Sequence, residues 1–357
     1  MSFVRPAIER MSGYVPGLQP TETKYVKLNT NENPYPPSPK VLAAIAKETE
    51  RLRLYPDPDS TLVRQAAAQL AGLDPDWVIA GRGSDEMLTI LCRTVVGAGD
   101  RVYFPYPTYS LYDVLVDIQE GVNCPVDFPK DWTLPKALFG NRGVLTFVAN
   151  PNAPSGTMVP PGEIARLAES LSGLLVVDEA YVDFADQNCA ALVSDHKNLV
   201  VLRSLSKSYS LAGLRVGYGL AHPDVIRELL KVKDSYNLDR LAIVGAAAAL
   251  EDQEHMRQNA ARVRVTRGRL VQGLEDLGFT TTPSVANFVL TTPPGPHQAE
   301  SVYQQLWDRH QILVRYFHKR RLENSLRISV GTDEEIDLLL AAIDKVLSPG
   351  AGQETNT

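Results

Sequence analysis

Short apolar runs alternate with amphipathic stretches along the first two thirds of the chain. Runs with the length and composition of buried strands occupy residues 77–80, 101–104, 144–149, 174–178, 198–202 and 216–220. Stretches with helical periodicity precede the first run, at residues 39–54, or lie between later runs, at residues 85–96 and 163–171. Strands that alternate with helices predict a mostly parallel sheet with helices on both faces, and therefore an α/β fold.

A second pattern begins at residue 223, where a long helical stretch runs to residue 277 with breaks near 237 and 252. Shorter elements follow it, namely strands at 285–290, 312–315 and 325–330 and helices at 299–310 and 333–347. Strands with covering helices predict a smaller α+β domain at this end of the chain. We expect four parts: an N-terminal arm (1–37), a large domain (38–255), a small C-terminal domain (256–347) and a disordered tail (348–357).

The arm is rich in proline, which excludes a long helix there. Segments of this kind are most often tails that lie on a protein surface. Its part at residues 29–37 is polar and turn-rich, as is typical of such a tail.

Four candidate site positions stand at or just beyond the carboxyl ends of the predicted strands. They are the turn at Gly83 and the residues Tyr109, Asp178 and Lys207. Ligands of parallel sheets bind at this edge, so these four positions predict a binding site. A buried strand that ends in a carboxylate is unfavourable unless the charge has a cationic partner. The turn Gly83-Ser84-Asp85 precedes a helix, whose free N–H groups suit a phosphate.

Lys207 follows an apolar strand directly and has hydroxyl groups on its N-terminal side. Ser204 and Ser206 precede it, and Arg215 stands eight residues beyond it. This pattern suits an amine at a cleft with serine and arginine donors for a phosphate. A lone lysine in a serine-rich loop is more often a solvated surface residue, so the stretch by itself leaves both interpretations open.

Three motifs together resemble the fold type I aminotransferases, which use pyridoxal 5′-phosphate (PLP). They are Ser-x-Ser-Lys-x(7)-Arg at 204–215, Asp-x-x-Tyr at 178–181, and Asn-Pro-Asn-Ala-Pro-Ser-Gly at 150–156. The resemblance implies that Lys207 forms the Schiff base with the cofactor. It implies that Asp178 pairs with the pyridine nitrogen, that Tyr181 donates to the ring oxygen, and that Tyr109 covers the ring face. The implied phosphate ligands are Gly83, Ser84, Asp85, Ser204, Ser206 and Arg215.

Further stretches are similar to the histidinol-phosphate aminotransferases within that family. They lie at residues 14–17, 28–34, 314–317 and 326–332, so the resemblance extends from about residue 14 to residue 347. It implies that histidinol phosphate and 2-oxoglutarate or glutamate are the substrates, and that Tyr14, Arg315 and Arg327 bind them. It further implies that the N-terminal arm (1–37) crosses the cleft over the active site. It also implies a homodimer in which Tyr55 reaches the cofactor phosphate of the neighbouring subunit.

One position departs from the family pattern, which usually reads Asn-Asn-Pro-Thr-Gly where this chain has Asn152-Ala153-Pro154-Ser155-Gly156. In the family the second asparagine donates to the ring oxygen of the cofactor. Ala153 lacks that donor, so the ring oxygen has one donor fewer unless Asn152 or a water molecule replaces it.

Composition narrows the classes of partner. The chain has 44% hydrophobic and 22% charged residues, as ordinary globular proteins do, and its formal charge of −6 argues against a nucleic-acid partner. Cys92, Cys124 and Cys189 lack metal-ligand spacing and predict buried free thiols. The N-terminus lacks the apolar core of a signal peptide, and the longest apolar run, 241–250, is too short to cross a membrane. We therefore expect a cytoplasmic protein.

Other functions remain open at this point. An aromatic amino-acid aminotransferase is the nearest alternative, and a phosphothreonine-type decarboxylase on the same scaffold is a weaker one. A regulatory PLP-binding module would need an attached DNA-binding domain, for which the pattern leaves no residues.

Overall fold

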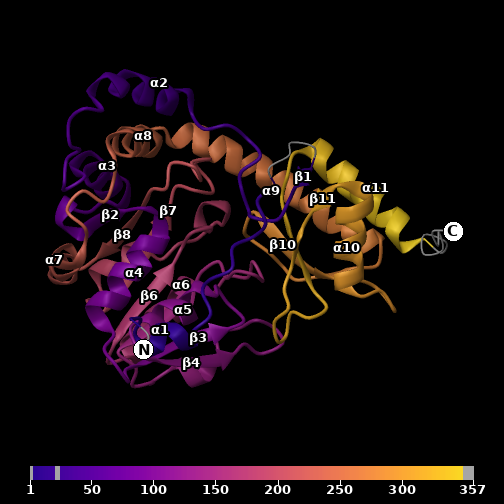
Figure 1. Cartoon of the computed structure of the whole chain (residues 1–357), viewed down its shortest axis with the longest axis horizontal. Coiled ribbons are helices and arrows are strands. Elements are labelled where there is room, and N and C mark those ends of the chain that lie inside the picture. The colour runs from indigo at the N-terminus through magenta and orange to yellow at the C-terminus, as the bar shows by residue number, and fades with distance from the viewer. Residues whose placement is uncertain (1–2, 21–24, 349–357) are drawn as a thin grey trace.

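A computed structural model of the chain describes residues 3–20 and 25–348 (Figure 1). Its centre is a seven-stranded sheet in the order β2-β8-β7-β6-β5-β3-β4. The strands are β2 (Val78–Gly81), β3 (Arg101–Tyr106), β4 (Val122–Asp127), β5 (Leu145–Ala149), β6 (Leu174–Asp178), β7 (Leu199–Ser204) and β8 (Gly217–Ala221). Pairs among β3 to β7 are parallel, whereas β8 runs antiparallel to both of its neighbours. The predicted α/β class is confirmed.

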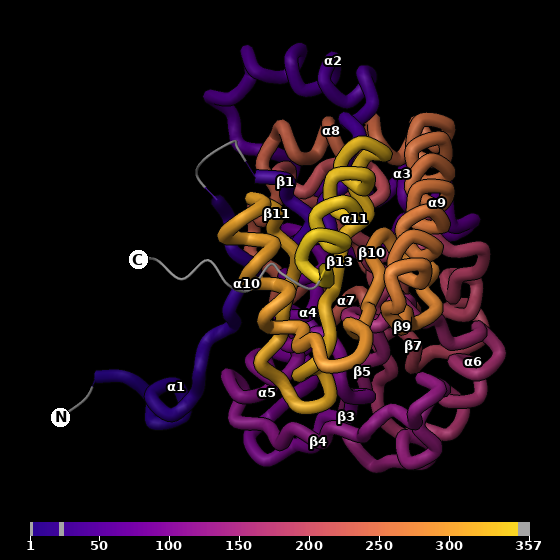
Figure 2. Tube along the Cα trace, turned by 90° about the vertical axis from the view of Figure 1, so that its right-hand side faces the viewer, coloured from indigo at the N-terminus to yellow at the C-terminus, as the bar shows by residue number. Residues whose placement is uncertain are grey.

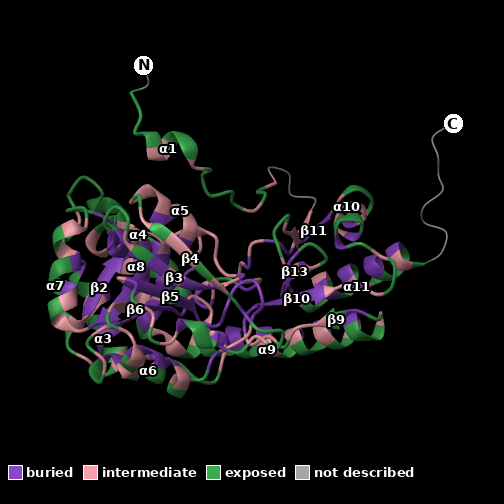
Figure 3. Cartoon of the chain, turned by 90° about the horizontal axis from the view of Figure 1, so that it is seen from below, coloured by how far each residue is buried: buried purple, intermediate pink, exposed green. Residues whose placement is uncertain are grey.

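Apolar side chains leave this sheet on both faces, because successive residues of a strand point in opposite directions. On β6, Val176 packs into one buried cluster, and Leu175 and Val177 pack into the other. Helices α4 (Gly83–Val95), α5 (Leu111–Ile118) and α7 (Pro223–Val232) cover the first face. Helices α3 (Thr61–Ala71), α6 (Pro161–Ser170) and α8 (Arg240–Glu251) contribute to the cluster on the second face (Figure 3).

A smaller antiparallel sheet, in the order β12-β13-β10-β9, lies beyond α9 (Gln253–Asp276). Its strands are β9 (Thr280–Thr281), β10 (Phe288–Thr292), β12 (Arg315–Tyr316) and β13 (Leu326–Ser329). Helices α10 (Ala299–His310) and α11 (Asp333–Leu347) pack beside it. The boundary expected near residue 255 falls in the first turn of α9.

The N-terminal segment contains α1 (Pro6–Arg10), which has no buried residue and lies to one side of the body in Figure 2. The chain then returns, and β1 (Val26–Lys27) pairs in parallel with β11 (Ile312–Leu313) of the C-terminal part. Helix α2 (Pro39–Glu48) follows and packs on α8.

Several predicted bounds differ from the structure. The helix expected at 39–54 ends at Glu48 and continues as a short 3₁₀ turn, and the strand expected at 312–315 is interrupted at Val314. The strand expected at 285–290 begins at Phe288, because the Val285 N–H donates instead to the carbonyl of Gly156.

Three other expectations concern the tail, the cysteines and membrane segments. Apart from Ser348, the tail lies outside the described residues. Cys92 and Cys189 are buried free thiols, but Cys124, on the edge strand β4, is partly exposed. Among the helices of the described residues, none is long and apolar enough to span a membrane.

Two glycines allow β8 to pass directly beneath the start of α4. A Cβ atom on Gly217 would lie 2.6 Å from the carbonyl carbon of Gly83 and 2.7 Å from the N atom of Ser84. Gly83 itself has a φ of 72°, in the left-handed region that glycine adopts without strain. The turn that begins α4 is therefore held directly against the sheet.

A buried ion pair joins β6 to β7 just beyond the sheet. Glu179 Oε2 lies 2.7 Å from Arg203 Nε, and neither side chain is more than 13% exposed. Arg203 also pairs with Asp183 at 3.2 Å, and Asp183 accepts a hydrogen bond from the Ser208 hydroxyl. The network thus connects the residues next to Asp178 with the loop that carries Lys207.

We predict that Arg203→Ala lowers the free energy of unfolding by about 3–5 kcal/mol, because it leaves the Glu179 charge buried without its partner. Chemical denaturation of the cofactor-free protein measures the change. The matched control is Glu179→Gln combined with Arg203→Met, which removes both charges and should cost much less. Equal losses in the two variants would contradict this account.

Candidate active site

A cavity of about 910 Å³ opens at the carboxyl edge of the large sheet. The last residues of β5, β6 and β7, which are Ala149, Asp178 and Ser204, all line it. The predicted site residues that line this cavity are Tyr14, Ser84, Asp85, Tyr109, Asp178, Tyr181, Ser204, Ser206, Lys207, Arg215, Arg315 and Arg327. Twelve residues predicted from separate stretches of sequence therefore meet at one cavity.

Asp178 is buried at the end of β6, 4% exposed. Its Oδ2 accepts a hydrogen bond from the Tyr112 hydroxyl at 3.1 Å, and its Oδ1 accepts one from the Ala180 N–H at 3.2 Å. Burial raises the pKa of Asp178 to about 6, and the hydrogen bond from Tyr112 opposes that rise. A cationic nitrogen placed against this carboxylate would be stabilised by it.

Tyr112 is a functional residue that the sequence analysis missed. It is fully buried on α5, and its ring stacks on Phe147 with centroids 4.6 Å apart. Its position three residues after Tyr109, on the apolar face of a short helix, made it look like an ordinary core residue. The hydrogen bond to Asp178 depends on the relative placement of α5 and β6, which no local pattern reveals.

Lys207 lies in the loop after β7, with its Nζ donating to the carbonyl of Thr30 at 3.0 Å. The same atom stands 5.8 Å from the centre of the Tyr181 ring. Burial, followed by the nearby Arg327 charge, lowers the pKa of Lys207 to about 8. A neutral amine, which is the nucleophilic form, is therefore accessible near neutral pH.

Hydroxyl and guanidinium donors gather at one end of the cavity. Ser84, Ser204 and Ser206 are buried there, and Arg215 donates from Nη1 to the Ser206 hydroxyl at 3.1 Å. Arg215 Nη2 also lies 3.1 Å from Asp85 Oδ2. The N-terminus of α4 has no side-chain cap, so its N–H groups are available to a ligand. A Cβ atom on Gly83 would lie only 2.8 Å from Arg215 Nη2, so it would fill the space between the turn and the guanidinium group. This donor set fits a phosphate.

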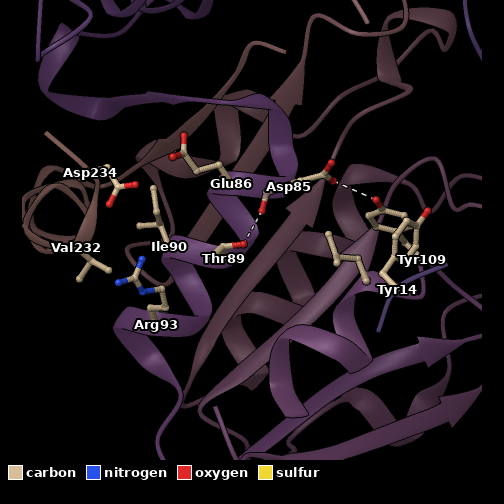
Figure 4. Close-up of a pocket in the computed structure, with 10 residues that line it drawn as sticks. Tyr14, Asp85, Glu86, Thr89, Ile90, Arg93, Tyr109, Val232 and Asp234 are labelled. Atoms are coloured by element: carbon tan, nitrogen blue, oxygen red, sulfur yellow. Dashed lines mark hydrogen bonds between the residues drawn. The ribbon is translucent and has the colours of Figure 1, made fainter. Parts of the chain in front are cut away.

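Tyr109 and Tyr14 form an aromatic wall beside Asp85 (Figure 4). The Tyr109 hydroxyl donates to Asp85 Oδ1 at 3.1 Å, and the Tyr14 ring meets the Tyr109 ring edge-on with centroids 5.8 Å apart. A smaller pocket of about 340 Å³ lies on the far side of Asp85, toward Arg93 and Asp234. Tyr14 belongs to the N-terminal arm, so the arm does contact the cavity.

Two arginines of the small sheet, Arg315 and Arg327, line the same cavity and have no carboxylate partner among the described residues. Arg327 donates from Nη2 to the carbonyl of Asn29 at 2.9 Å, and its buried Nε makes no hydrogen bond. Arg315 donates to the carbonyls of Val15 and Pro16 at 3.4 Å. Within the part of the chain that the structure describes, neither arginine forms an ion pair. Burial lowers the pKa of Arg327. Unpaired guanidinium groups in a cavity suit an anionic ligand.

Tyr55 is a predicted site residue that lies outside the cavity. Its side chain is 79% exposed and stacks on the ring of Tyr236 with centroids 4.8 Å apart. It does not line the cavity of its own chain.

The side-chain amide of Asn152, the candidate replacement for the donor lost at Ala153, already has partners in the surrounding loops. Its Nδ2 donates to the Pro107 carbonyl at 3.2 Å and to the Ser155 hydroxyl at 2.9 Å. Its Oδ1 accepts from the Thr108 hydroxyl at 2.8 Å. The whole amide is therefore committed to the surrounding loops.

The fold and the cavity match a known family. Residues 23–343 match the family model described as aminotransferase class I and II. The chain belongs to this aminotransferase family, which confirms the resemblance seen in its motifs.

Within the family, the chain is similar to histidinol-phosphate aminotransferases. It is 47% identical to histidinol-phosphate aminotransferase 1 of a Nostoc species, over 97% of this chain and 98% of that protein. It is 49% identical to the histidinol-phosphate aminotransferase of Rhodopirellula baltica, over 96% of this chain and 95% of that protein. The crystal structure of histidinol-phosphate aminotransferase from Sinorhizobium meliloti in complex with pyridoxal 5′-phosphate superposes with a TM-score of 0.87 at 27% identity, covering 97% and 98% of the two chains.

We predict that the Lys207 amine of the cofactor-free protein titrates near pH 8. Brief acetylation at a series of pH values, followed by peptide mass spectrometry, measures this midpoint, with the exposed Lys47 as the reference in the same digest. Arg327→Ala should raise the midpoint, because a neighbouring positive charge disfavours the protonated amine. Identical profiles for Lys207 and Lys47 would contradict the prediction.

Proposed function

We propose that this chain is a PLP-dependent aminotransferase that exchanges the amino group of histidinol phosphate with 2-oxoglutarate, in the histidine biosynthesis of the cytoplasm. The observation that carries the proposal is the position of Lys207. Its amine lies in one cavity with a cluster of phosphate donors, a pair of arginines without ion-pair partners among the described residues, and the buried Asp178 carboxylate. The full-length similarity to histidinol-phosphate aminotransferases supports the same substrate.

When bound, PLP supplies an aldehyde that links to amines and a ring that withdraws electrons from the adjacent carbon. Ser84, Ser204, Ser206 and Arg215 would hold its phosphate, and Asp178 would keep a proton on the pyridine nitrogen. The Tyr181 hydroxyl would donate to the ring oxygen. Lys207 Nζ would hold the cofactor and, once released by the substrate amine, take the proton from the carbon that bears the amino group.

Arg315 and Arg327 would bind the anionic end of each substrate. Arg315 and Arg327 are paired directly opposite each other on β12 and β13, and their guanidinium groups lie 5.3 Å and 5.5 Å from the centroid of the Phe317 ring. Among the described residues their hydrogen bonds go only to main-chain carbonyls, so a phosphate or carboxylate can add charge-assisted hydrogen bonds without breaking an ion pair. A phosphate on one substrate and a carboxylate on the other can share this place.

The proposal includes a homodimer with shared sites. Large apolar side chains are exposed around Tyr55 and just before α1, at Phe3 and Val4. The exposed apolar residues near Tyr55 in the sequence or in contact with it are Leu42, Leu52, Leu54, Leu62 and Tyr236. Apolar surface of this kind favours association of protein chains. Tyr55 would then reach the phosphate of the neighbouring subunit.

We expect turnover with histidinol phosphate to exceed turnover with phenylalanine or phosphothreonine, measured side by side with 2-oxoglutarate as the acceptor. Arg327→Ala should weaken binding of both histidinol phosphate and glutamate by about 1.5–3 kcal/mol, the range for a hydrogen bond to a charged group. Arg320→Ala is the matched control, because that exposed arginine pairs with Asp127 outside the cavity. Faster turnover of phenylalanine would favour an aromatic aminotransferase, and release of carbon dioxide from phosphothreonine would favour a decarboxylase.

We predict that mixing Tyr55→Phe chains with Lys207→Ala chains restores activity. If Tyr55 serves the neighbouring site, each heterodimer has one site with neither substitution and one with both. Activity should therefore exceed the sum of the separate variants once the chains have exchanged. Exchange is verified by native mass spectrometry, and exchanged chains without the gain would refute the shared site.

A further inference from the structure

Asn31 links the small sheet to the cavity of the large domain. It is 1% exposed and has a φ of 58°, a conformation that asparagine tolerates better than most residues. Its N–H donates to the Ser329 hydroxyl at 2.9 Å, and its carbonyl accepts from Asn287 Nδ2 at 2.9 Å. Its side-chain Nδ2 donates to the Tyr181 hydroxyl at 3.0 Å. Asn31 is therefore held by β13 and its neighbouring strand while it contacts a residue next to the catalytic lysine.

The hydrogen bonds determine which end of the Asn31 amide faces Tyr181. Ser329 Oγ accepts the main-chain N–H of Asn31, so its own hydrogen is free to donate to Asn31 Oδ1 at 3.0 Å. With Oδ1 occupied as an acceptor, Nδ2 is the atom that faces Tyr181. The Tyr181 oxygen therefore accepts a hydrogen bond, and its own hydrogen must point elsewhere.

The hydrogen of the Tyr181 hydroxyl is free to point into the cavity. Among the described residues, no protein acceptor takes a hydrogen bond from the Tyr181 O–H. Phe288 meets the Tyr181 ring edge-on at 4.9 Å and, with Ala153 and Ala286, forms a small apolar cluster against it. Tyr181 lines the cavity together with Lys207 and Asp178.

We propose that Asn31 is a positioning residue that orients the Tyr181 hydroxyl and strengthens it as a donor to the ring oxygen of the bound cofactor. The proposal rests on the function proposed above. A hydroxyl that accepts one hydrogen bond becomes a better donor of another. This chain depends on that effect because Ala153 offers no donor and Asn152 is committed elsewhere.

Charged groups around Tyr181 act on the same hydroxyl. Burial raises the pKa of Tyr181, whereas Arg327 and the hydrogen bond from Asn31 oppose that rise. The titratable and charged groups that face Tyr181 or Lys207 are Asp85, Asp178, Glu32, Arg215, Arg327, Tyr14, Tyr109 and Tyr112. Asn31→Gly leaves all of these in place and adds no charge, so a change in its cofactor spectrum reports on the Asn31–Tyr181 contact.

The test is the pH midpoint of the colour change of the PLP-loaded protein, read from its visible absorbance. A ring oxygen with a weaker donor is a stronger base, so the proton that it shares with the lysine linkage is held to higher pH. Asn31→Gly keeps the left-handed backbone and should raise the midpoint by about 0.5–1 unit. Asn31→Asp should raise it at least as far, because a carboxylate accepts the Tyr181 hydrogen instead of donating.

The matched control is the Tyr181→Phe background. There Asn31→Gly should produce no further shift, since the hydroxyl through which Asn31 acts is absent. An equal shift in both backgrounds, or unchanged midpoints in Asn31→Gly and Asn31→Asp, would overturn the inference. A wild-type protein that takes up no PLP would instead refute the proposed function, so the two failures are distinguishable.

Discussion

A carboxylate that is buried without a cation organises the cavity. Asp178 ends β6 and faces inward, whereas its neighbour Glu179 points to the other side and pairs with Arg203. The two acidic residues are adjacent, but the alternation of a strand gives them opposite environments. Within the described residues Asp178 has hydrogen bonds from Tyr112 and Ala180 and no ion pair. The fold therefore leaves one charge to be balanced by a bound cation.

The N-terminal arm completes what the sheet begins. Thr30 accepts from the Lys207 amine, Asn29 accepts from Arg327, and Asn33 donates to the Lys207 and Ser208 carbonyls. A few consecutive residues thus hold both the loop that carries Lys207 and the Arg327 side chain of the small sheet. Because every one of these contacts is long-range, the position of these arm residues depends on both sheets.

The sequence predicted the large sheet and most of the cavity well. Asp178, Lys207 and the turn at Gly83 were found because parallel strands bring their carboxyl ends to one edge, so position along the strand implies position in space. Helices α7, α8 and α9, with the breaks between them near residues 237 and 252, followed from periodicity, as did strands β10 and β13 of the small sheet. Strand β4 was missed because proline and exposed polar residues obscure its alternation.

The contacts that were not predicted are of a different kind. Tyr112 and Asn31 act through partners 66 and 150 residues away. In the sequence, Tyr112 stands on an apolar helix face and Asn31 in a polar turn. Both patterns are common at positions that have no functional role. The sequence also left open whether Asn152 replaces the donor lost at Ala153, since only the folded loops show that the Asn152 amide is already occupied.

The contact of Gly217 with the start of α4 has a consequence for how this protein can evolve. Any side chain at position 217 would push against the main chain of Gly83 and Ser84, where α4 begins. Substitution of Gly217 is therefore expected to be selected against, however stable the rest of the sheet. Sequence changes that alter the cavity are expected instead away from this contact, for example at the exposed arm residues Tyr14 and Val15, which also line it.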